Sequence, residues 1–248
     1  MMNQIEINAK AIELRKQFGE DENSYVDVFA LASQISDLTL VLYPMGDHIS
    51  GVCIKNEGAN LIAINSLMSY GRQRYSLALE LYHLFYDDSE GVSISSKTFD
   101  SSAENEKIAD CFASYFLAPY NALRSAIQKK ESKLLSMRDV ISLEQSFGLS
   151  HQAMLRRLVS DKFLDQEMAN QLSGSVIYFA KQYGYDDKLY MPTNEEKQKR
   201  TFGNYIVQAE ELKDRGIIST GKYEELLLDA FRYDIVYGED EGGGAIDD

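Results

Sequence analysis

The chain has 248 residues, of which 44% are hydrophobic and 26% are charged, a balance typical of globular proteins that bury a core. Its 39 acidic residues outnumber the 25 basic ones, and the formal net charge of −14 argues against a protein that works mainly on nucleic acid, because phosphate binding needs clustered lysine and arginine. No stretch approaches the roughly 18 apolar residues of a membrane span, and the first residues contain no signal-peptide core, so we expect a cytoplasmic protein with no membrane partner.

Two amphipathic helices are expected first, because apolar residues recur at near-helical intervals over residues 5–18 and again over residues 28–35. The period then changes. Three short runs rich in β-branched residues follow, namely "LTLVLY" (38–43), "ISGVCIK" (49–55) and "NLIAIN" (60–65), and turn-forming sequences separate them. They predict three antiparallel strands joined by tight turns.

Two strong helices separated by a polar segment come next. The first carries "YSLALELYHLFYDD" (75–88), in which leucines recur on one face. Residues 87–102 are too poor in apolar side chains to pack as an element, so we expect a loop there. The second helix, "AENEKIADCFASYFLAP" (103–119), is strongly amphipathic and is stopped by Pro119.

The following segment, residues 137–164, has the outline of a helix-turn-helix. One helix ends near Phe147, a turn contains Gly148, and Ser150 is a plausible cap for the second helix. A polar break at residues 191–201 separates these helices from a last pair. The end of the chain is acidic and contains three consecutive glycines, a composition that predicts disorder.

Cys53 and Cys111 show no pattern of spacing that would indicate a metal site or a disulfide framework. Both have apolar neighbours, so we expect buried free thiols. Free thiols fit a reducing compartment.

The segment that contains Glu80 and His83 carries most of the zinc-peptidase motif H-E-x-x-H. In that motif two histidines four residues apart lie on one face of a helix and bind one zinc ion, and the glutamate activates the metal-bound water. Glu80 and His83 have the required spacing, but Leu79 occupies the position of the first histidine. On its own E-x-x-H is a weak pattern, and a surface glutamate beside a structural histidine is the alternative interpretation.

The neighbouring sequence favours a metal site. Glu106 follows His83 by 23 residues and stands at the start of the second strong helix. The third ligand of a zinc peptidase that uses glutamate is found in such a place. Three strands, a helix bearing E-x-x-H, a loop, and a helix that opens with a glutamate are the elements of a minimal zinc-peptidase domain, in order.

These segments together resemble the ImmA/IrrE metallopeptidases. That family usually shows I-x-I-N, then R-x-R-F-T-L-A-H-E-L-x-H-L, then E-x-x-A-N/D-x-F-A-x-x-L-L-M-P. This chain has "IAIN" at 62–65, "RQRYSLALELYHLFY" at 72–86 and "EKIADCFASYFLAP" at 106–119. The resemblance runs over about residues 5–165. It implies an α+β fold, with a zincin-like peptidase core made of a three-stranded antiparallel sheet plus helices, followed by a helix-turn-helix-like helical region.

We predict four regions along the chain. We predict a zinc-peptidase-like core over residues 1–130 and a helix-turn-helix-like helical region over residues 131–190. A C-terminal helical extension is expected over residues 191–238, and a disordered acidic tail over residues 239–248.

The resemblance also implies a role for each motif residue. Glu80 matches the general base, and His83 and Glu106 match two zinc ligands. Leu79 matches the first histidine ligand but offers no lone pair, so zinc would keep two protein ligands where catalytic sites need three. The chain is therefore expected to bind zinc weakly and to hydrolyse slowly, if at all.

Four other side chains come into question as a replacement ligand. His48 stands in the turn before the second strand, and His151 opens the second helix of the helix-turn-helix. Each is interpreted as a local polar residue. Glu104 and Asp110 could coordinate metal, but neither restores an imidazole.

Three functions are compared. The resemblance implies a zinc endopeptidase that cleaves a helix-turn-helix repressor or an antitoxin-like protein, often encoded on a mobile element, with its activity impaired here by Leu79. The alternative is a pseudopeptidase that sequesters its partner without cutting it, as in a toxin–antitoxin or phage-related pair. A DNA-binding regulator is the third. Arg156 and Arg157 are the only adjacent basic pair in residues 137–164, so a structural role for that segment is favoured over DNA binding.

Overall fold

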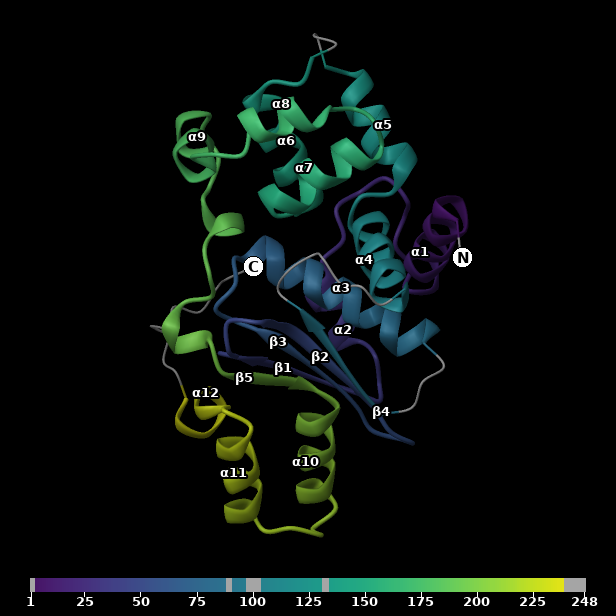
Figure 1. The fold of residues 1–248 in the computed structure, drawn as a ribbon. Helices are drawn as coiled ribbons and strands as arrows, with labels where there is room; N and C mark the ends of the chain where they lie inside the picture. The colour runs from purple at the N-terminus through teal and green to yellow at the C-terminus, as the bar shows by residue number, and fades with distance from the viewer. Residues whose placement is uncertain (1–2, 88–90, 97–103, 131–133, 239–248) are drawn as a thin grey trace.

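The computed structural model describes residues 3–87, 91–96, 104–130 and 134–238 (Figure 1). The strands are β1 (Leu38–Tyr43), β2 (Ile49–Lys55), β3 (Asn60–Asn65), β4 (Gly91–Ser96) and β5 (Arg200–Gly203). The helices are α1 (Gln4–Gln17), α2 (Val28–Ser33), α3 (Tyr70–Tyr86), α4 (Glu104–Leu117), α5 (Tyr120–Gln128), α6 (Met137–Phe147), α7 (His151–Ser160), α8 (Gln166–Gln171), α9 (Val176–Gln182), α10 (Asn204–Asp214), α11 (Thr220–Asp229) and α12 (Tyr233–Tyr237). Short 3₁₀ turns occur at Lys188–Tyr190 and Glu195–Lys197. The α+β class is thus confirmed, and the tail expected to be disordered, residues 239–248, lies outside the described residues.

The sheet differs from the predicted three antiparallel strands. It has five strands in the order β4-β2-β3-β1-β5, and β1 pairs with β3 in parallel, with Leu40 opposite Ile62. Only β2 and β3 form the expected antiparallel pair within the first three strands. The prediction joined strands that are neighbours in the sequence, whereas β2 lies on the far side of β3 from β1. Hydrophobic pattern identifies a strand but not its partner.

Two strands lie in segments that the sequence suggested were irregular. β4 falls inside the predicted loop 87–102 and pairs antiparallel with β2. β5 falls at the end of the polar break and pairs antiparallel with β1. Both are edge strands held largely by backbone hydrogen bonds. In β4, Val92 is 63% exposed and Ile94 is 59% exposed, so no apolar face is buried that could have revealed the strand.

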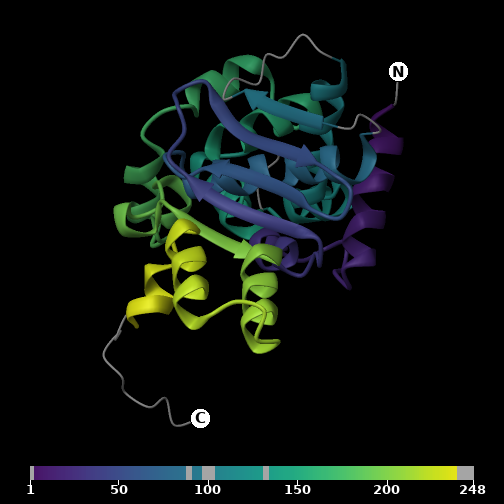
Figure 2. The same cartoon turned by 90° about the horizontal axis from the view of Figure 1, so that it is seen from below.

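The helices are arranged in layers about the sheet. α1, α3 and α4 cover one face, and α5 to α8 lie beyond them on the side away from the sheet (Figure 1). Seen from below, α10, α11 and α12 project beside β5, at the edge of the sheet opposite β4 (Figure 2). The chain therefore returns from the helical region to the sheet before it forms its last helices.

One main hydrophobic core runs from α1 through the sheet, α3 and α4 into the helix-turn-helix segment. That segment folds as predicted, because Gly148 has a left-handed backbone (φ 67°) and the Ser150 side chain caps α7. Arg157 is 4% exposed and donates to the Ser114 hydroxyl at 3.0 Å, so this basic residue serves packing. The domain boundaries given above remain a prediction.

Both cysteines are free thiols. Cys53 is buried as expected, and Cys111 is only partly so. In the portion of the chain that the structure covers, no helix combines the length and apolar character needed to cross a membrane.

Candidate functional site

Helix α3 lies at the centre of the molecule and carries the E-x-x-H segment. Every residue from Gly71 to His83 is buried, because α3 is packed between the sheet and the helices that cover it. Leu77 and Leu81 are fully buried and anchor the helix. Glu80 is 0% exposed and His83 is 2% exposed, so both motif side chains are held in the interior.

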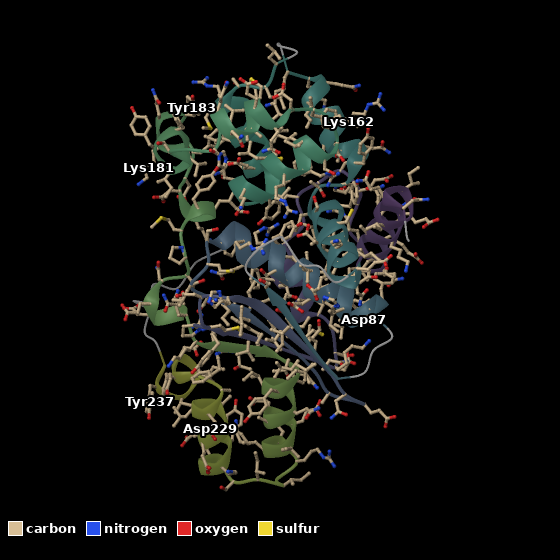
Figure 3. All side chains as sticks on the ribbon, viewed as in Figure 1. Asp87, Lys162, Lys181, Tyr183, Asp229 and Tyr237 are labelled. Carbon is tan, nitrogen blue, oxygen red and sulfur yellow. The ribbon has the colours of Figure 1, made fainter. Side chains whose placement is uncertain are left out.

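The His83 imidazole lies between two carboxylates. Its Nδ1 is 3.1 Å from Asp87 Oδ2, and its Nε2 is 3.1 Å from Glu106 Oε1 in the first turn of α4. Figure 3 shows Asp87 at the C-terminal end of α3. Burial lowers the pKa of His83, but Glu106, Glu80 and Asp87 together outweigh burial and raise it above its ordinary value. Two residues predicted as metal ligands from distant parts of the sequence therefore face each other.

Glu80 is a fully buried acid. Its carboxylate oxygens accept no hydrogen bond of normal length and angle from the described residues. Burial raises the pKa of Glu80 to about 8, although the Ser95 hydroxyl and His83 act in the opposite direction. The side chain packs against Gly51 of β2, where an added Cβ would lie 2.6 Å from Glu80 Oε1. Gly51 thus provides the space that the carboxylate occupies.

Leu79 belongs to the main hydrophobic core and is 4% exposed. No group of three or more histidine, cysteine, aspartate or glutamate side chains that could hold a metal ion is found in the described ranges. A catalytic zinc takes three protein ligands and a water molecule, whereas the predicted ligands that meet at His83 Nε2 are two, His83 itself and Glu106. The described residues therefore do not fit a catalytic zinc ion.

The alternative ligands lie in other environments. His48 is exposed in the connection between β1 and β2. The His151 ring contacts Glu144 Oε1 at 2.6 Å and Leu172 O at 2.8 Å. Asp110 accepts a hydrogen bond from the Tyr75 hydroxyl at 2.9 Å, and Glu104 is exposed at the start of α4. None of them supplies the missing donor.

Sequence reasoning missed Asp87 and Gly51. Asp87 follows His83 by four residues, the spacing at which helix side chains meet, so this partner could have been found. Gly51 is a glycine inside a strand, which often marks a bulge or a close approach. The pairing of β2 with β4 does shift its register between Ile49 and Gly51.

Comparison with known proteins extends this description. A sequence model of a peptidase family, described as the IrrE N-terminal-like domain, matches residues 36–159, half of the chain. No curated protein matches the sequence. A solved structure of a Mycobacterium tuberculosis transcriptional regulator is similar over 62% of this chain and 46% of that chain, with a TM-score of 0.41 and 15% identity. This chain thus spans less than half the length of that regulator.

Proposed function

Because this chain belongs to the IrrE N-terminal-like peptidase family, we propose that it is a zinc-poor pseudopeptidase that binds a regulatory protein without cutting it. The observation that carries the proposal is Leu79, a core residue at the position where the family motif has a zinc ligand. Since the remaining donors do not fit a catalytic zinc ion, no hydrolytic step is assigned to Glu80. An impaired zinc peptidase that still cleaves slowly is the competing function.

The binding surface that we propose is the edge of β4 that faces away from β2. Within the described residues β4 is one of the two terminal strands of the sheet, and it lies beside α3. Unpaired backbone groups on an edge strand can hydrogen-bond an extended peptide, and side chains at alternate positions then give specificity. Val92 and Ile94 are two residues apart and both exposed, so they offer an apolar contact next to such a peptide.

The partner that we propose is a helix-turn-helix repressor or an antitoxin-like protein. This assignment rests on the family resemblance, in which members act on such regulators. Ser95 of β4 acts on Glu80, so a partner segment held along β4 would pair with the strand that faces this carboxylate. Retention of the partner in an intact form would make the protein a sequestering regulator.

Zinc stoichiometry after exhaustive dialysis tests the proposal. The chain is compared with Leu79→His, which restores the missing imidazole, and with Leu79→Gln, which adds a polar side chain of similar length without an imidazole. We expect only the histidine variant to retain about one zinc ion per chain, because a third ligand completes the site. If the unchanged chain retains an equivalent amount, the zinc-poor assignment is wrong, and the slow peptidase becomes the better explanation.

A further inference from the structure

A cavity of about 840 Å³ lies at the N-terminal end of α3, and neither Glu80 nor His83 is among the residues that line it. Its walls come from α2, from β1 and β5, and from the beginning of α3. Residues 187–198, which lead from the helical region back to β5, complete it. The volume falls within the range of about 300–1,000 Å³ that is typical of sites for small molecules.

The interior wall is apolar and partly aromatic. Leu40, Leu42 and Phe202 contribute from the two strands. The rings of Phe29 and Tyr70 stack with centroids 5.8 Å apart and an interplanar angle of 14°. Such a wall suits a flat aromatic group, which can extend an existing stack of rings.

The charged side chains that line the cavity have a net positive charge, whereas the whole chain is acidic. Three basic side chains, Lys188, Lys197 and Arg200, meet two acidic ones, although the whole chain carries a formal net charge of −14. One of the two acids, Asp187, is paired with Lys181 at 2.8 Å, and one of the three bases, Arg200, is paired with Asp234 at 3.0 Å, so the lining keeps a small net positive charge. A cation-rich rim on an acidic protein attracts an anion locally.

The segment that closes the cavity is fixed in place. Tyr70 N–H donates to Met191 O at 2.7 Å, and the Thr193 hydroxyl donates to Gln73 Oε1 at 3.0 Å. The Gln198 side chain donates to Thr193 O at 3.1 Å. These bonds join the segment to α3 and to itself, so a ligand would enter a preformed site and lose little affinity to ordering of the protein.

We propose that this cavity binds a small molecule in which a planar aromatic ring system carries an anionic group. The ring lies against Phe29, Tyr70 and Phe202, and the anion lies at the rim near Lys188 and Lys197. This site contains none of Glu80, His83 and Glu106, and it does not depend on whether the chain binds or cuts a partner.

Fluorescence titration with 1-anilinonaphthalene-8-sulfonate tests the site, because this dye joins aromatic rings to a sulfonate. Ser33→Phe and Asn194→Trp each fill the cavity from an exposed lining position. Gln34→Phe is the matched control, because it adds the same ring one residue away from Ser33, outside the lining. We expect one saturable site in the unchanged chain, at least a tenfold loss of affinity in both filled variants, and unchanged affinity in the control. Full affinity in either folded filled variant overturns the proposal.

The charge requirement is tested with Lys197→Ala, compared with Lys199→Ala, which removes an equal charge outside the lining. We expect the lining variant to lose about two- to fivefold in dye affinity, the size of one exposed ion pair, and the control to lose none. The uncharged analogue N-phenyl-1-naphthylamine should bind both variants as it binds the unchanged chain. Equal affinity of the sulfonate dye for both lysine variants would refute an anionic ligand.

Discussion

Replacing Glu80 with glutamine is expected to stabilise the protein. Glu80 is fully buried, its carboxylate oxygens accept no hydrogen bond of normal length and angle from the described residues, and burial raises its pKa from 4.5 to about 8. At pH 7 the folded state keeps a proton that the unfolded chain releases, and this difference lowers the free energy of unfolding by about 3 kcal/mol. Glutamine has nearly the same shape and carries no ionisable proton, so Glu80→Gln removes that loss.

The raised pKa of Glu80 also fixes how the stability of the protein changes with pH. Because the folded state binds the proton more tightly, stability falls as pH rises from about 4.5 to about 8. The gain from Glu80→Gln should be near zero at pH 4.5, about 3 kcal/mol at pH 7 and about 5 kcal/mol at pH 9. Urea unfolding of both proteins at these three pH values measures the gain.

Glu144→Gln is the matched control, since Glu144 is also 0% exposed. Its carboxylate accepts from the Tyr190 hydroxyl at 2.8 Å and contacts His151 Nδ1 at 2.6 Å. Removing this charge takes away the countercharge of the protonated His151 ring, so Glu144→Gln should destabilise the protein at pH 7. The reasoning fails if Glu80→Gln is no more stable than the unchanged chain at pH 7, or if its gain is the same at every pH.

Three further changes have defined outcomes. Gly51→Ala should lower the free energy of unfolding by about 1–3 kcal/mol, because the added methyl group overpacks against the Glu80 side chain. This loss should be smaller in a Glu80→Ala background. A double-mutant cycle measures the difference, and additive losses would contradict the prediction. Burial lowers the pKa of His151, but Glu144 outweighs burial and raises this pKa above its ordinary value. The stability that the His151–Glu144 pair contributes is therefore lost as pH rises through the folded-state pKa of His151. The imidazole titration followed by NMR should move to lower pH in Glu144→Gln, and an unchanged midpoint would remove Glu144 as the cause. Leu79→His should lose about 2–3 kcal/mol of stability without metal, the value of a buried leucine, and should recover stability when zinc is added. Thermal unfolding with zinc and with chelator measures this difference, which should be absent in the unchanged chain.

The sequence was most informative where one helix buries a strong apolar face. α3, α4 and the helix-turn-helix segment were all located, and His83 and Glu106, which the motif spacing brought together, do lie 3.1 Å apart. Their roles as metal ligands remain a prediction. The parallel pairing of β1 with β3 could not be read from hydrophobic pattern, because that pattern carries no information on partners.

The edge strand β4 and the cavity could not be predicted from the sequence for a different reason. β4 is joined to β2 by backbone hydrogen bonds, which leave no mark on residue type, and its Val92 and Ile94 point away from the core. The cavity between β1, β5 and residues 187–198 joins segments far apart in the chain. Each of these segments has an ordinary amino-acid composition, and only the fold brings the aromatic rings and the lysines together.

The two terminal strands of the sheet differ in what they offer to a second copy of the chain. Within the described residues β4 has six residues, whereas β5 has four and continues directly into α10, which contacts both β5 and β1. A short edge strand offers few backbone groups to a strand of another chain, and edges of this kind limit the growth of fibrils. Pairing between copies is therefore expected at β4 rather than at β5. The short C-terminal strand thus restrains the addition of further strands on its side of the sheet.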